Sequence, residues 1–189
     1  KGMFEDAIKS IKEKNNNLTE DISSRDNEVD RLHWLIARQH RIIQNNVSFI
    51  EKMAITTSTA TSAYLISRIL ERIGDHVVRI AKESIVLNNQ DIDDELLEKI
   101  ERAGNFSLNL LNKSIGAFSK KELKSANETI EKSHELHKLC EDIDTISLKK
   151  EAPTAIAIGY IVESIRRIGE YSEDISETVM NHLIGEQKI

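Results

Sequence analysis

The chain has 189 residues, of which 31% are charged and 4% aromatic, with seven glycines, one proline and one cysteine. This length allows one domain or two small ones, and the composition favours helices over sheets. Acidic residues outnumber basic ones 32 to 26, so the net charge of −6 argues against binding of a nucleic acid by this fragment. The single cysteine, Cys140, excludes an intramolecular disulfide and a zinc site built from cysteines, and it is typical of the reducing cytosol. The longest apolar run is about eight residues, far short of the roughly 20 needed for a transmembrane segment.

Three helices are expected in the first half of the chain. Apolar residues at helical spacing already begin at Met3 and Phe4, so we expect the sequence to start partway through a larger polypeptide. Asn17, with Glu20 three residues later, predicts the N-cap of a second helix. The apolar stripes of the second and third helices are Ile22, Val29, Leu32 and Ile36, and Ile66, Ile69, Ile73, Val77 and Ile80.

Three more helices are expected after a linker at residues 88–90. Asp91 or Asp93 can cap the fourth helix, and Ser119 with Glu122 predicts a capping box for the fifth. The only proline, at position 153, suits the first turn of the last helix.

An internal repeat relates the two halves. Arg72-Ile73-Gly74 recurs 95 residues later as Arg167-Ile168-Gly169, and a carboxylate follows each triplet. The earlier helices align at an offset of 107, so the first half contains a connection that is longer by 107 − 95 = 12 residues. Two such units bury their apolar faces within and between the copies. We therefore predict an all-α fold of six helices, arranged as two tandem up-and-down three-helix bundles with spectrin-like packing, at residues 1–88 and 92–189.

Carboxylates at helical spacing accompany the repeated glycine. Glycine inside a helix costs roughly 1 kcal/mol relative to alanine, so its repetition indicates that a neighbouring backbone or a bound ion needs room; inheritance from the duplication is the alternative. Glu71 and Asp75 lie one turn apart, away from the apolar stripe, and Asp26 and Asp30 form a second ladder with His33. Neighbouring helices would bring the two pairs together as an oxygen-rich site for a hard cation. An exposed charge network with nearby arginines is the other interpretation.

The segments ERIGDHVVRIAKE and RRIGEYSEDISE, each ending a three-helix unit, resemble the PhoU family of phosphate-uptake regulators. The resemblance covers essentially the whole chain. It implies a non-enzymatic cytoplasmic regulator whose acid-x-x-x-Asp motifs hold metal ions on the bundle surface. By this similarity the metal ligands of the first repeat are Asp26, Asp30, Glu71 and Asp75, with iron, zinc, manganese or magnesium as the ion.

The resemblance also implies partners. These are the ATPase or the permease of a phosphate transporter and, in many bacteria, a sensor histidine kinase in the membrane. A homodimer is expected as well. Some archaeal members carry an N-terminal AbrB-like DNA-binding domain, which suits a chain that starts inside a helix, so an archaeal-type member is one interpretation.

The second repeat departs from the pattern. Arg166 stands in the place of Glu71, and the counterpart of the other ladder is absent, so the four-carboxylate site is not duplicated. Glu170 and Asp174 still form an acid-x-x-x-Asp pair, which Arg166 and Arg167 are placed to neutralise. We expect one well-formed metal site and one weaker site.

Two alternatives stay open. A helical adaptor that uses its acidic face directly on a basic partner needs no metal, and its binding would be indifferent to chelators and weakened by salt. A di-iron carboxylate oxidoreductase would use an acid-x-x-His step such as Glu131 and His134, but the further glutamates, Glu71 and Glu163, lie off the apolar stripes. Because the sequence has neither a glycine-rich phosphate loop nor a Ser-His-Asp order, we predict that the chain is not an enzyme.

Overall fold

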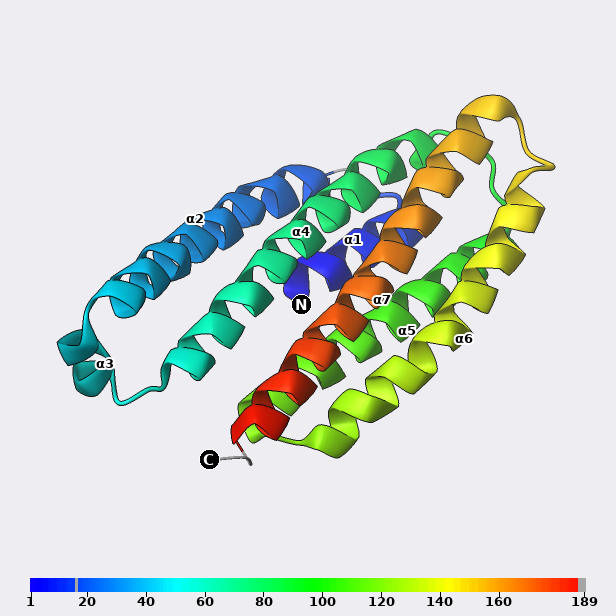
Figure 1. Cartoon of the computed structure of the whole chain (residues 1–189). Coiled ribbons are helices and arrows are strands. Elements are labelled where there is room, and N and C mark those ends of the chain that lie inside the picture. Colours follow the sequence, from blue (N-terminus) through cyan, green and yellow to red (C-terminus); the bar gives the residue numbers. More distant parts are fainter. Residues whose placement is uncertain (16, 187–189) are drawn as a thin grey trace.

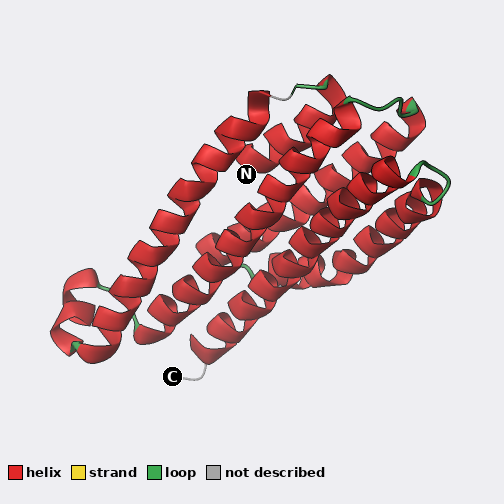
Figure 2. Ribbon diagram, turned by 90° about the horizontal axis from the view of Figure 1, so that it is seen from above, coloured by secondary structure: helices red, strands yellow, loops and turns green. Residues whose placement is uncertain are grey.

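The computed structural model describes residues 1–15 and 17–186, and within these ranges the chain forms helices and loops but no strand (Figure 2). The all-α prediction is confirmed. The predicted number of six helices is too low, because part of the long connection in the first half folds into an additional short helix. In chain order the described helices are α1 (Gly2–Glu13), α2 (Asn17–Asn45), α3 (Val47–Met53), α4 (Thr57–Asn88), α5 (Asp94–Lys120), α6 (Leu123–Ser147) and α7 (Ala152–Glu186).

The long helices form two antiparallel three-helix units that pack against each other (Figure 1). α1, α2 and α4 make up one unit and α5, α6 and α7 the other, with α4 and α7 in the most extensive contact between them. His76 of α4 and Tyr171 of α7 are 95 residues apart and therefore equivalent in the repeat. Their ring centroids lie 5.8 Å apart, so equivalent positions of the two repeats meet where α4 packs against α7. The predicted tandem bundles are confirmed.

The core follows the predicted apolar stripes in α4 and α7 but not along the whole of α2. Ile73 and Ile80 of α4 and Ile168 of α7 are at most 5% exposed. In α2, by contrast, Leu32 is 59% exposed although the sequence places it on the apolar stripe. As given in this sequence, α1 has 12 residues, and α5, its counterpart in the second unit, has 27. None of the described helices has the length and apolarity needed to cross a membrane.

The helix ends match the sequence-based caps in part. The Asp93 carboxylate accepts a hydrogen bond from the backbone N–H of Leu96 at 2.9 Å, as predicted, and the proline at position 153 lies in the first turn of α7. The capping box at Ser119 is wrong, because α5 continues to Lys120 and Ser119 donates to the carbonyl of Ile115 instead. The N-cap predicted at position 17 is also wrong, since Asn17 is already the first residue of α2.

The two N-caps of the second repeat give a matched test of capping. Replacing Asp93 with alanine removes both its bond to Leu96 and its ion pair with Lys150, so we expect about 1 kcal/mol less stability to urea. Glu122 is the N-cap of α6 but makes no side-chain capping bond, so Glu122→Ala serves as the control and should cost less than about 0.5 kcal/mol. Equal losses of stability in the two variants would show that the side-chain bonds of Asp93 do not stabilise the protein.

Candidate metal site

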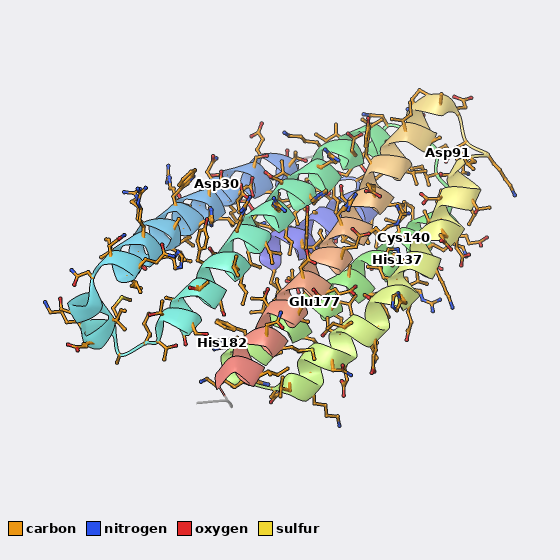
Figure 3. All side chains as sticks on the ribbon, in the orientation of Figure 1. Asp30, Asp91, His137, Cys140, Glu177 and His182 are labelled. Carbon is orange, nitrogen blue, oxygen red and sulfur yellow. The ribbon has the colours of Figure 1, made fainter. Side chains whose placement is uncertain are left out.

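The two predicted carboxylate pairs of the first repeat lie on neighbouring helices. α2 and α4 pack side by side and antiparallel, as shown by the 3.1 Å contacts of Thr19 with the carbonyl of Ala81 and of His33 with Ser67. Asp30 projects from α2 in the first unit (Figure 3). The charges of the other three acids all act on Asp26 and raise its pKa, so the structure brings the predicted set to one edge of the bundle. This set comprises Asp26, Asp30, Glu71 and Asp75.

Asp26 is the most unusual member of this set. Its Oδ1 atom is buried and accepts no hydrogen bond. Burial first, and then the negative charges of Asp30, Asp75 and Glu71, raise the pKa of Asp26 to about 6, while the charge of Lys82 acts in the opposite direction. An anionic oxygen without a donor is costly in such a place, and a bound cation is one way to satisfy it.

Gly74 provides the space for this oxygen. A Cβ atom at position 74 would lie 2.3 Å from Oδ1 of Asp26, a distance that no side chain tolerates without movement. The glycine therefore lets a carboxylate of α2 reach the backbone of α4. The sequence predicted room for a neighbouring backbone or an ion; the structure shows room for a neighbouring side chain.

The four acids do not form a closed cage. Asp75 is exposed, whereas Asp26, Asp30 and Glu71 are half-buried. Within residues 1–15 and 17–186, no three carboxylate, histidine or cysteine side chains come close enough together to hold an ion as they stand. The donors suit a hard cation in chemical type, and Asp26 presents an oxygen that lacks a partner, but ion binding requires the other carboxylates to rotate toward it.

The second repeat uses the equivalent place differently. A Cβ atom at Gly169 would lie 2.2 Å from Cδ2 of Leu136, so an apolar side chain occupies the space that Asp26 takes beside Gly74. Glu170 pairs with Arg167 at 2.8 Å and lies 3.9 Å from His137, while burial raises the pKa of Asp174.

Arg166, the other arginine placed beside this pair, contacts different acids. It pairs with Asp144 of α6 and with Glu163, each at 2.6 Å. Of the two predicted neutralising residues, only Arg167 reaches Glu170. Of the two second-repeat candidates, Glu170 is therefore engaged by Arg167 and His137, and the expectation of a weaker site in this repeat stays a prediction.

Three other chemically reactive residues, Cys140, His40 and Glu163, are held in structural surroundings. Cys140 is fully buried, and burial raises the pKa of its thiol to about 12, so it stays protonated at neutral pH (Figure 3). His40 bonds Thr61 at 3.2 Å and stacks on Tyr64. Glu163, one of the glutamates required for a di-iron site, is engaged by two arginines of its own helix.

Two homologous three-helix units, with a glycine-carboxylate motif in the third helix of each, define a duplicated helical-bundle protein. The PhoU domain family matches residues 1–84 and 100–179, and the chain belongs to this family.

Two curated relatives align along nearly the whole chain. One is a phosphate-specific transport system accessory protein PhoU homologue from Caulobacter vibrioides, 25% identical over 96% of this chain and 80% of the relative. The other is a protein of the same description from Clostridium acetobutylicum, 22% identical over 96% of this chain and 84% of the relative.

Two solved structures share the fold. PhoU from Pseudomonas aeruginosa superimposes with a TM-score of 0.85 at 17% identity, covering 97% of this chain and 90% of that protein. The phosphate transport system regulatory protein PhoU from Streptococcus pneumoniae gives a TM-score of 0.82 at 18% identity, covering 97% and 87%.

Proposed function

We propose that this chain is a non-enzymatic regulator of phosphate uptake, which acts as a metal-binding helical adaptor on a phosphate transporter. The family membership and the descriptions of the two relatives as phosphate transport accessory proteins support the general role. The chain would bind the ATPase or the permease of the transporter on the cytoplasmic side of the membrane. A sensor kinase would be a second partner. We include self-association as a homodimer in this proposal.

Metal binding is proposed because Oδ1 of Asp26 is buried and accepts no hydrogen bond. A divalent or iron cation bound by Asp26, Asp30, Glu71 and Asp75 would satisfy this oxygen and cancel the repulsion among the four acids. Two of these ligands belong to α2 and two to α4, so the ion would fix the relative position of the two helices. Metal occupancy would in this way control the shape of the first unit and its affinity for the transporter.

The first test is metal content. We expect the untagged chain to retain about one ion when equilibrated with iron, zinc, manganese or magnesium and then desalted, because hard cations prefer clustered carboxylates. Asp26→Asn combined with Asp75→Asn should lose this ion. A second double variant, Glu20→Gln with Glu51→Gln, removes the same charge from exposed positions outside the site and should keep it. Loss of the ion in both variants, or in neither, would refute the assignment.

The adaptor role needs a separate measurement. Phosphate uptake is compared in a bacterium that lacks its own PhoU protein and expresses either this chain or the Asp26→Asn, Asp75→Asn variant. Restored regulation by the chain and not by the variant supports the proposal. Restored regulation by both supports a regulator that works without the metal.

A metal-independent adaptor is the second candidate. The exposed position of Asp75 and the partial exposure of Asp30 and Glu71 favour it, because acids in such positions can pair directly with lysine or arginine side chains of a partner. This candidate predicts transporter binding that survives a chelator and weakens with salt.

A further inference from the structure

The second half of α2 and the short helix α3 form a surface that is both apolar and basic. Residues 31–56, which we call the basic tip, carry four basic residues and one acidic residue, a net charge of +3, so the rest of the chain carries −9. Figure 1 shows α3 and the adjoining end of α2 at one extremity of the first unit. Large apolar side chains of the basic tip stand in solvent, among them Trp34 at 63%, Leu35 at 49%, Ile42 at 47% and Met53 at 39% exposed.

The exposure of this outer face of α2 does not depend on the length of α1. The second unit shows which positions a long first helix covers, since α6 corresponds to α2 at the offset of 107 and packs against the 27-residue α5. The counterparts of Trp34 and Leu35 are Glu141 and Asp142, and both are exposed. A helix packed on α2 as α5 packs on α6 would therefore leave Trp34 and Leu35 in solvent.

The basic tip is a property of the first unit alone. At the same offset, Arg38 and Arg41 correspond to Thr145 and Leu148, so the outer face of α6 lacks both arginines. The helix α3 lies in the longer connection of the first half, between α2 and α4, where the second unit has only the short turn between α6 and α7. Apolar and basic side chains that replace acidic ones on a solvent-facing helix indicate a binding surface.

The end of α2 offers an anion-binding group of side chains within this surface. An open hollow of about 520 Å³ is lined by Arg38, Arg41, Ile42, Asn45 and Asn46. Neither Arg38 nor Arg41 forms an ion pair with any of the described residues. Guanidinium groups that lack an acid bind phosphate groups through paired hydrogen bonds. With Ile42 beside them, the hollow suits a phosphate group that is attached to an apolar body.

We propose that the basic tip docks this protein on a membrane surface that contains anionic phospholipids. Arg38 and Arg41 bind the lipid phosphates, while Trp34, Leu35 and Ile42 enter the headgroup region, where tryptophan and other apolar side chains beside arginines are favoured. The same membrane repels the acidic remainder of the chain, so the charge distribution turns the tip toward the surface. This surface is separate from the carboxylate set, and the inference depends neither on metal binding nor on the transporter as a partner.

Two other occupants fit the basic tip less well. In a symmetric dimer through the tip, the arginines of one copy would face those of the other, because a two-fold interface presents the same patch on both sides. A folded acidic protein needs a continuous apolar centre, whereas Arg38 and Arg41 stand between the apolar pair Trp34 and Leu35 and the next exposed apolar residue, Ile42. A layer of lipid headgroups has no fixed shape and accepts both kinds of side chain.

The first experiment is a titration with lipid vesicles. Trp34 is the only tryptophan of the chain, so its fluorescence reports contact between the tip and lipid. We expect its emission to shift to shorter wavelength with vesicles of phosphatidylglycerol and phosphatidylcholine in equal parts, and we expect the chain to co-sediment with them. Vesicles of phosphatidylcholine alone should bind at least about tenfold more weakly, and added salt should weaken binding to the anionic vesicles.

A first pair of variants measures the contribution of charge. Arg38→Gln combined with Arg41→Gln should weaken binding to the anionic vesicles by about twentyfold, because each arginine near such a surface contributes roughly a factor of five. Arg102→Gln combined with Lys149→Gln removes the same charge from exposed positions of the second unit. This control should change the affinity by less than about twofold, since these positions lie away from the tip.

A second pair measures the apolar contribution. Ile42→Ser should weaken binding by about fivefold or more through lost apolar contact with lipid. The matched control is Leu148→Ser, which removes a leucine that is 83% exposed at the C-cap of α6 and should leave binding unchanged.

Three results would overturn the proposal. The first is the absence of binding to the anionic vesicles, or equal effects of the variants and their controls. The second is binding of soluble polyglutamate as tightly as the vesicles, because the tip would then recognise acidic charge and not lipid. The third is a shift of Trp34 emission with rising protein concentration alone that Ile42→Ser abolishes, because this would assign the tip to a second copy of the chain.

Discussion

Replacing Gly169 with alanine should lower the free energy of unfolding by about 2 kcal/mol, although alanine is the better helix former by about 1 kcal/mol. The new Cβ would lie 2.2 Å from Cδ2 of Leu136, and because Leu136 is only 1% exposed, it can move away only by displacing other core side chains. Urea unfolding at neutral pH measures the loss, which corresponds to a decrease in Tm of about 4–8 °C for a chain of this size.

The repeat supplies the control for this prediction. Gly74→Ala puts its Cβ against Oδ1 of Asp26, the far end of a half-buried carboxylate that can rotate into water. We expect a change between zero and about 1 kcal/mol of stabilisation, because the helix gains propensity and the carboxylate leaves an unfavourable site. In a Leu136→Ala background, Gly169→Ala should likewise become neutral or stabilising, since the obstacle is gone. If Gly74→Ala lowered the stability as much as Gly169→Ala, the glycine would be required by the backbone and not by the space that the neighbouring side chain occupies.

The fold was largely predictable because its determinants are periodic. The stripe through Ile73 and Ile80 and its copy through Ile168 and Ile175 require only a regular helix with one apolar face, which the spacing states directly. The ends of the helices were less predictable. Ser119 and Glu122 match a capping box, but α5 continues to Lys120 and is ended by the left-handed conformation of Lys121. The exposure of Leu32 was not predicted either, because an apolar stripe does not show which of its residues a neighbouring helix covers.

The candidate site was also predictable in part. The spacing of Glu71 with Asp75, and of Asp26 with Asp30, places each pair on one face of its helix, and the neighbouring positions of α2 and α4 bring the pairs together. Which carboxylate is buried depends on the register between the two helices, and a single sequence does not encode that register in a readable form. The motif at Gly74 indicated close approach but not that Asp26 would be the group that approaches.

Asp26→Asn should raise stability at pH 8 by about 1–2 kcal/mol and leave it nearly unchanged at pH 4. The pKa of Asp26 is raised to about 6 by burial and by the surrounding carboxylates, whereas the unfolded chain has the ordinary value near 3.8. Between these two pH values the folded state holds more protons than the unfolded state, so stability falls as the pH rises toward 6 and remains lower above it. The full shift would correspond to about 3 kcal/mol, and we reduce this figure because solvent screens a half-buried group.

Urea unfolding of the chain and of Asp26→Asn at pH values from 4 to 8 isolates this effect, since the other carboxylates titrate in both proteins. Glu20→Gln, at an exposed position of the same helix, is the control, and its stability should change with pH in the same way as that of the unmodified chain. A constant difference between Asp26→Asn and the chain at all pH values would show that Asp26 ionises normally. A cation bound at this site would stabilise the charged carboxylate, so adding the metal that the chain retains should remove the advantage of Asp26→Asn at pH 8. If that advantage persists with the metal present, Asp26 is a buried acid that the fold tolerates and not a ligand.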